Sequence, residues 1–212
     1  TAQLASMRTD QIAALDSAVI ETLTTAQVVA FGTAQVAALT TQQLTRVSDN
    51  QIKSMETADL AAFTTDQVRA LSNDQVVALT TAQMPSLLPS QVVALTTAQI
   101  ANMENADLAV LTTAQVNILT TAQAKALTAD QVGTLTTAQV AALRTDQLAA
   151  LDSSDVESLS TQSMVALSSL QVSALTTAQI SRLAQKHVQA LETVDLAALT
   201  TTQVQTLSEE QV

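Results

Sequence analysis

An eight-residue repeat runs through this whole chain without an insertion or a deletion, and it constrains the fold more than any other feature. The unit is clearest in residues 136–143, which read Thr-Thr-Ala-Gln-Val-Ala-Ala-Leu. We number these octad positions one to eight; positions five and eight, held here by Val140 and Leu143, are apolar in every copy. A fixed period of this kind indicates a repeat protein, in which each unit buries its apolar residues against neighbouring units. We predict a single continuous octapeptide-repeat array over residues 1–212, a fragment of a longer array.

Positions one and four of the octad have the spacing of a helix capping box. The hydroxyl of Thr136 can accept from the backbone N–H of Gln139, whose side chain returns to the N–H of the threonine. The pair recurs at Thr24/Gln27, Thr40/Gln43, Ser72/Gln75, Thr96/Gln99, Ser168/Gln171 and Thr200/Gln203. Aspartate replaces glutamine at Asp59, Asp107, Asp155 and Asp195. There it puts a negative charge in the first turn, which the helix dipole favours. Each octad is therefore predicted to be one cap residue followed by about seven helical residues.

Two other folds compete with a stack of short helices. In one continuous helix, eight residues turn about 80° beyond two full turns, so the apolar stripe would wind around the helix and face no fixed partner. A β-solenoid needs alternating apolar residues and tight turns, whereas Val140 and Leu143 are three apart and the only glycines are Gly32 and Gly133. We predict an all-α solenoid, a superhelix with one short capped helix per octad, and keep the β-solenoid and the coiled coil as alternatives.

The joint between octads is a Leu-Thr step such as Leu111-Thr112. Both residues disfavour the left-handed conformation that often ends a helix in a hairpin. A single cap residue in the β region can turn the corner instead. We therefore expect successive helices to meet at wide angles, with about three or four octads per turn of the superhelix. Hairpins of two octads are the alternative.

The one irregular stretch is residues 84–89, which read Met-Pro-Ser-Leu-Leu-Pro. Pro85 falls inside the expected helix, where it removes a backbone donor and clashes with the preceding turn at a cost of about 3 kcal/mol. Leu88 holds the cap position without a side chain that can cap, whereas Pro89 is at the first helical position, where proline is tolerated. Because the octad register continues across this stretch, we predict a kink here and no domain boundary.

The composition limits the function. Nearly half of the residues are apolar but only Phe31 and Phe63 are aromatic, so the core must be thin and aliphatic. A net charge of −11 argues against nucleic acid, which is bound through clustered Lys and Arg, and against anionic membrane surfaces. Residues 75–103 are uncharged, but Gln and Thr interrupt them repeatedly and two prolines fall inside. Membrane insertion is therefore not expected.

No catalytic, cofactor-binding or metal-binding residue is predicted. His187 is the only histidine and takes the position that glutamine fills elsewhere, so a polar residue in a first helical turn explains it. The chain has no cysteine and no glycine-rich phosphate loop. Paired carboxylates such as Asp152 and Asp155 suit a helix N-terminus. We predict a protein that is not an enzyme and holds no cofactor.

Two binding functions stay open beside a purely structural one. A concave solenoid face can bind a peptide, as armadillo-type repeats do, although such grooves usually carry aromatic or charged anchors that are scarce here. Regularly spaced threonine hydroxyls on the surface could bind an ordered lattice such as ice or a polysaccharide, although helix capping already accounts for most of the threonines. No specific partner is predicted, and binding would be to protein or to further copies of the array.

Leu-Thr-Thr-Ala-Gln followed by an apolar residue occurs at residues 79–84, 95–100 and 135–140. This repeat resembles the octapeptide arrays of very large bacterial surface or secreted proteins, which are labelled adhesins or haem-utilisation proteins. The resemblance covers the whole chain and implies a stalk or spacer between an anchoring region and a distal binding region, at the cell surface or outside the cell. A haem function receives no support, because His187 is the only conventional ligand.

Overall fold

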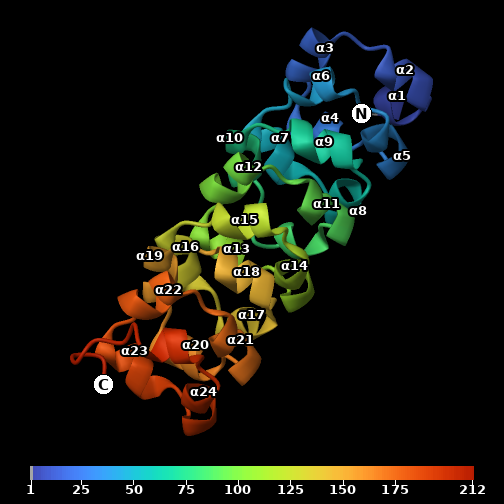
Figure 1. Cartoon of the computed structure of the whole chain (residues 1–212). Coiled ribbons are helices and arrows are strands. Elements are labelled where there is room, and N and C mark those ends of the chain that lie inside the picture. The colour runs from blue at the N-terminus through green and yellow to red at the C-terminus, as the bar shows by residue number, and fades with distance from the viewer. Residues whose placement is uncertain (1) are drawn as a thin grey trace. The chain divides into compact units, whose positions relative to one another are not determined.

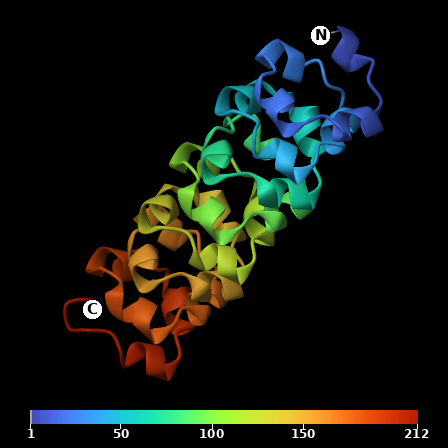
Figure 2. The same ribbon diagram turned by 90° about the horizontal axis from the view of Figure 1, so that it is seen from above.

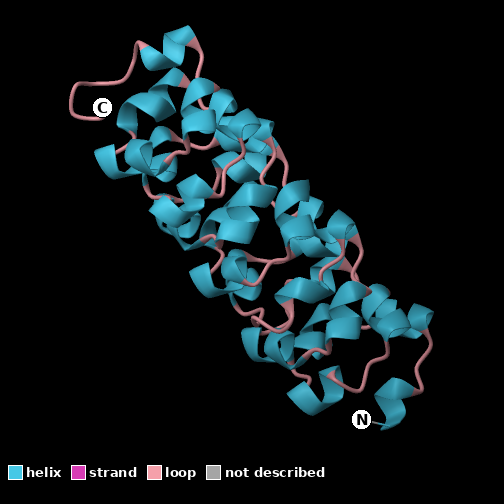
Figure 3. Ribbon diagram, turned by 90° about the horizontal axis from the view of Figure 1, so that it is seen from below, coloured by secondary structure: helices cyan, strands magenta, loops and turns pink. Residues whose placement is uncertain are grey.

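A computed structural model describes residues 2–212, and every regular element in that range is a helix (Figure 3). The chain divides into two compact units, residues 1–103 and 104–212. In both units each octad forms a helix of four to six residues, except for one octad that forms a 3-10 turn and the last, incomplete octad. The predicted all-α repeat solenoid is confirmed, and the β-solenoid and the long coiled coil are excluded.

Most of the helices are labelled in Figure 1. The first unit contains α1 (Ala2–Ala5), α2 (Thr9–Ala13), α3 (Ser17–Glu21), α4 (Thr25–Val28), α5 (Thr33–Ala37), α6 (Thr41–Leu44), α7 (Asp49–Ser54), α8 (Thr57–Ala61), α9 (Thr65–Ala70), α10 (Asn73–Val77), η1 (Met84–Ser86), α11 (Pro89–Ala94) and α12 (Thr97–Asn102). The second unit contains α13 (Asn105–Ala109), α14 (Thr113–Ile118), α15 (Thr121–Lys125), α16 (Ala129–Thr134), α17 (Thr137–Ala142), α18 (Thr145–Ala150), α19 (Ser153–Glu157), α20 (Thr161–Val165), α21 (Ser169–Ala174), α22 (Thr177–Arg182), α23 (Gln185–Ala190), α24 (Thr193–Ala197) and α25 (Thr201–Val204).

The octad of α17 shows how eight residues make both a helix and a corner. Thr136 has an extended backbone (φ −67°, ψ 156°) and forms the predicted capping box with Gln139. Its Oγ1 accepts the Gln139 N–H at 3.2 Å, and its own N–H donates to Gln139 Oε1 at 2.8 Å. The helix ends at Ala142 because Leu143 is extended again (φ −61°, ψ 136°). Two extended residues therefore form each such corner, and the predicted run of about seven helical residues is wrong.

Successive helices do not pair as hairpins. Within each unit, the helices that pack closely are three octads apart, as in α5 against α8 and α17 against α20. No residue of the described range 2–212 has a positive φ, so no left-handed residue closes a hairpin. The coiled course of each unit can be followed in Figures 1 and 2. This packing excludes the alternative of two-octad hairpins and agrees with the prediction of three or four octads per turn.

The core of each unit is built from positions five and eight. Val140 and Leu143 are 0% and 3% exposed, and the two phenylalanines, Phe31 and Phe63, take position eight and are buried. Ala141 lies on the exposed face of its helix. The core is therefore the thin, aliphatic one that the sequence predicts, although position four, which is polar, is also buried.

The irregular stretch in the first unit is a single 3-10 turn, η1. Pro85 has no N–H, and the helix of this octad is replaced by i→i+3 bonding around Met84. The next helix, α11, begins at Pro89 as predicted. The Leu88 side chain does not cap, but its N–H donates to Gln91 Oε1 at 2.7 Å. The octad register therefore continues through the prolines.

Replacing Thr136 with alanine is expected to lower the free energy of unfolding by about 1 kcal/mol, because it removes the side-chain acceptor of the Gln139 N–H. Thr137→Ala is the matched control, since Thr137 is exposed and is already the first residue of α17. That variant should be neutral, because alanine is the better helix former. Urea denaturation of both variants measures the difference, and a larger loss for Thr137→Ala would contradict the cap assignment.

Candidate functional site

A row of buried glutamine side chains at octad position four is the most unusual feature of both units. Gln139 is 2% exposed, although glutamine is mostly a surface residue. Its Nε2 donates to the carbonyl oxygens of Leu108 at 2.9 Å, Ala109 at 3.2 Å and Leu111 at 2.8 Å. These carbonyls lie at the C-terminal end of α13 and in the corner after it, where intrahelical partners are missing. One side chain thus joins the start of its own helix to the end of a helix in the preceding turn.

We call this contact the glutamine staple: position-four Nε2 donates to the carbonyl oxygen 28 residues earlier. Gln67, for example, lies 2.7 Å from Leu39 O and also 3.0 Å from Val36 O, which is 31 residues earlier. The staple occurs within one unit at Gln35, Gln43, Gln51, Gln67, Gln75, Gln83, Gln91, Gln99, Gln139, Gln147, Gln171, Gln179, Gln203 and Gln211. Successive turns are therefore held together by side chains as well as by the apolar core.

The staple is the feature that the sequence reasoning missed. A capping box uses only the side-chain oxygen of position four, and glutamate would serve that purpose as well. Only glutamine also carries two N–H donors. The repeated choice of an amide at this position, where a carboxylate would suit the helix dipole better, is the signal that could have revealed a second, buried partner.

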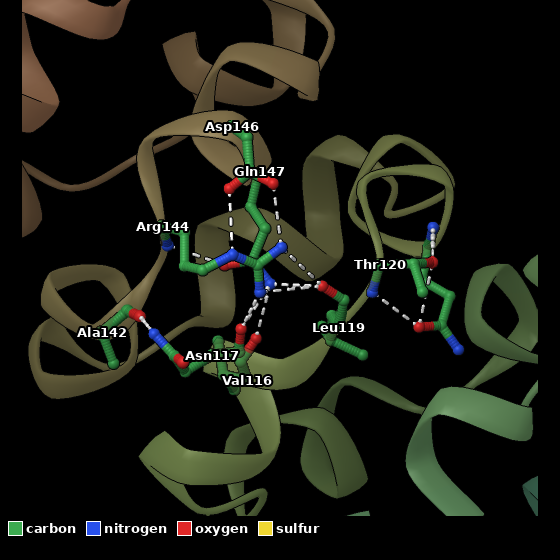
Figure 4. A network of polar contacts seen from close by, with 9 residues as sticks. Val116, Asn117, Leu119, Thr120, Ala142, Arg144, Asp146 and Gln147 are labelled. Atoms are coloured by element: carbon green, nitrogen blue, oxygen red, sulfur yellow. Dashed lines mark hydrogen bonds and ion pairs between the residues drawn. The ribbon is translucent and has the colours of Figure 1, made fainter. Parts of the chain in front are cut away.

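Arg144 strengthens one corner of the second unit (Figure 4). It replaces the usual threonine at position one of the α18 octad, and its guanidinium donates to the carbonyl oxygens of Asn117 and Leu119. Leu119 O also accepts the staple of Gln147 at 2.6 Å. The same guanidinium pairs with Asp146 at 3.0 Å and lowers the pKa of that carboxyl. The Arg144 guanidinium therefore interacts with main-chain carbonyls and a carboxylate of the same unit.

Four octads place an aspartate where glutamine forms the staple. Asp59, Asp107, Asp155 and Asp195 are between 2% and 5% exposed. Burial, and then the neighbouring carboxylate of Glu104, raises the pKa of Asp107 to about 6. Burial likewise raises the pKa of the Asp59 and Asp155 carboxyls. The predicted place in the first helical turn is confirmed for these residues. For Asp59, Asp107 and Asp155, burial disfavours the ionised form and so opposes the expected gain from a negative charge near the helix N-terminus.

His187 takes the same position in α23 and is fully buried. Its Nδ1 accepts the N–H of Ala184 at 3.3 Å, and its Nε2 has no hydrogen-bond partner among the described residues. Burial, and then the charge of Lys186, lowers the pKa of the imidazole, which is therefore neutral at pH 7. The prediction of a polar first-turn residue is right in position, but the side chain is enclosed and does not face solvent.

No three His, Cys, Asp or Glu side chains of residues 2–212 gather in a group that could hold a metal ion. Position four of the second unit also includes a buried serine, Ser163, whose hydroxyl bonds that of Ser160 at 2.9 Å. At position four, glutamine side chains donate hydrogen bonds to main-chain carbonyls, and the residues that replace glutamine change or remove those bonds. The prediction that the chain has no catalytic or cofactor site stays a prediction.

No helix formed by residues 2–212 is both long enough and apolar enough to cross a membrane.

Three segments of the chain match the sequence profile of the ALTTAQ repeat, at residues 52–88, 100–137 and 148–185. Together the three segments cover more than half of the chain. No curated protein matches it. Gln67 and Gln179, both of which form staples, lie inside matched segments, so the profile describes the repeat that makes this contact.

Proposed function

The chain belongs to the ALTTAQ repeat family, and we propose that it is a stalk or spacer in a large bacterial surface or secreted protein, without enzymatic activity. It is a structural region of tandem repeats. The observation that carries the proposal is the glutamine staple, which repeats in the same geometry in both units. The buried amide groups, which could otherwise contribute to a binding site, form hydrogen bonds between turns of the array.

The staple explains how such an array gains length without changing its design. Within each unit the closely packed helices are three octads apart and each staple joins octads that are four apart, so a further octad adds the same core residues and the same hydrogen bonds. Stability in such proteins is a sum over neighbouring units. A surface of dispersed acidic residues, with a net charge of −11, keeps the array soluble. The location outside the cell rests on the resemblance to octapeptide arrays of bacterial surface proteins.

Deleting residues 128–151, which are three whole octads, is expected to leave a folded protein, because every remaining position-four residue meets an equivalent corner. Deleting residues 128–155 is the control. The four extra residues shift the octad phase, so position four and the two apolar positions no longer face their partners. Circular dichroism and thermal unfolding should show native helicity per residue for the first variant and a large loss for the second. Equal behaviour of the two deletions would contradict the proposed modular array.

The role itself is tested in the parent protein. The deletion of residues 128–151 should preserve the activity of the flanking regions, and proteases added to intact cells should cleave the array. Ala141→Lys and other changes at exposed positions should have no effect. One exposed substitution that abolishes activity while helicity is unchanged would identify a specific binding site, and the spacer proposal would then be wrong.

A further inference from the structure

The four octads with aspartate at position four also have an acidic residue at position one. Their pairs are Glu56/Asp59, Glu104/Asp107, Asp152/Asp155 and Glu192/Asp195. No octad with glutamine at position four has an acidic residue at position one. In these octads, two carboxyl groups replace the threonine of position one and the glutamine of position four. The pairs recur every five or six octads along the chain.

Asp59 shows what this exchange does to the staple. In the register of the staple, position four of this octad faces the corner that contains the carbonyls of Val28 and Phe31, which are 31 and 28 residues earlier, the separations seen for Gln67. An ionised carboxylate has no hydrogen to donate, so at this position, where Asp59 is 4% exposed, it cannot replace the amide donor of the staple. A protonated carboxyl has one O–H donor.

The charged groups around Asp59 are all negative. Its own helix, α8, is preceded by Glu56, and the elements packed against α8, which are α5 and η1, carry no charged residue. The helix before the facing corner, α4, carries none either. Burial, and then the Glu56 carboxylate, raises the pKa of Asp59.

Asp155 also has an acidic residue at position one, but its surroundings include two basic residues, Arg182 and Lys125. Asp152 precedes its helix, and Glu157 within the helix is paired with Arg182 of α22 at 2.8 Å. The helix α16, which packs against α19, contributes the exposed Asp130, and α15, the helix before the facing corner, contributes the exposed Lys125. Burial is the largest cause that raises the pKa of this carboxyl, and the charge of Asp152 adds to it.

We propose that the acidic octads of Asp59 and Asp155 are proton-operated staples. Near neutral pH the ionised aspartate leaves the facing corner without a donor, and in mild acid the protonated carboxyl donates to a corner carbonyl and fastens the two turns. The second carboxylate, at position one, favours uptake of the proton by repelling the ionised form. Each unit of the array thus contains a joint that tightens when the surroundings become acidic.

The direction of the pH effect follows from the raised pKa. A folded-state pKa above the ordinary 3.8 means that the folded chain binds the proton first, so stability rises as the pH falls from 7 toward about 4. His187 opposes this, because its lowered pKa makes protonation costly below its ordinary 6.5. The ion pairs that lower the pKa of Asp10 and Asp146 lose their contribution only near and below 3.8.

The test compares thermal unfolding of the full chain at pH 7 and pH 4.5 for the unmodified protein and for Asp59→Gln. The variant restores the staple, so it should melt higher at pH 7 by several degrees, and this advantage should shrink at pH 4.5. Asp74→Gln is the matched control, because Asp74 is an exposed carboxylate of the same unit. Its difference from the unmodified chain should be the same at both pH values. A constant difference for Asp59→Gln as well would overturn the proposal.

A second measurement starts from the unmodified chain and does not depend on how Asp59→Gln folds. Carbon-13 NMR of the Asp59 carboxyl in the unmodified chain should give a titration midpoint above 3.8, and Glu56→Thr should move that midpoint down. A midpoint at or below 3.8 would overturn the proposal. Calcium chloride that raises the melting temperature at pH 7, through an effect that Asp59→Gln removes, would also overturn it, by showing that the paired carboxylates hold a cation instead of a proton.

Discussion

Replacing Leu143 with alanine is expected to lower the free energy of unfolding by about 2–5 kcal/mol, because the change leaves a cavity in a thin core. Leu143 is 3% exposed and sits at the corner after α17. Its own carbonyl accepts the staple of Gln171 at 2.7 Å, which holds the adjoining turn in place. The turns are therefore not free to close over the space, and the cost should fall in the upper part of this range. Urea denaturation followed by circular dichroism measures it, since the chain has no Trp or Tyr for fluorescence.

Ala141→Lys is the matched control for this prediction. Ala141 is in the same helix, two residues before Leu143, and its side chain is exposed. A long, solvated side chain at such a position usually changes stability by less than about 0.5 kcal/mol. Equal destabilisation by the two changes would show that α17 presents a different face to the core.

The helices, their caps and the apolar core could be predicted from the sequence because each depends on residues within one octad. Thr136 and Gln139 are three apart and form the capping box that their spacing indicates. Val140 and Leu143 are also three apart and are both buried. Local spacing is visible in a single sequence. Helix length was overestimated, because the extended backbone of Leu143 is decided by the corner it must make with the next helix.

The partners of position four could not be predicted, because they lie 28 and 31 residues away and carry no side-chain signature. The acceptors of Gln139 are main-chain carbonyls, which every residue has. For the same reason the sequence did not reveal that Asp107 and His187, which were predicted only to lie in a first helical turn, are buried. They are buried because they occupy the same octad position as the glutamines. The hydropathy of a polar residue does not indicate that its position is buried.

Replacing Gln139 with methionine is expected to cost about 2–4 kcal/mol, although methionine matches the length of glutamine and is more apolar. The change removes the acceptor of the Thr136 N–H and the donor of the Leu108 and Leu111 carbonyls in one step. A buried polar group that loses its partner costs about 1–3 kcal/mol, and only part of this is recovered by burying a more apolar side chain. Denaturant titration of the full chain measures the loss.

Two further variants separate the staple from the cap. Gln162→Met is the control for composition, because Gln162 is exposed on α20 and its side chain makes no hydrogen bond within residues 2–212; this change should be nearly neutral. Gln139→Glu retains an oxygen for the Thr136 N–H but places a carboxylate against the carbonyls that the amide nitrogen contacts. If the staple holds the turns together, this variant should lose at least as much stability at pH 7 as Gln139→Met, and should recover part of it in acid, when the carboxyl can donate. A Gln139→Glu protein as stable as the unmodified chain at pH 7 would mean that the cap alone accounts for the glutamine.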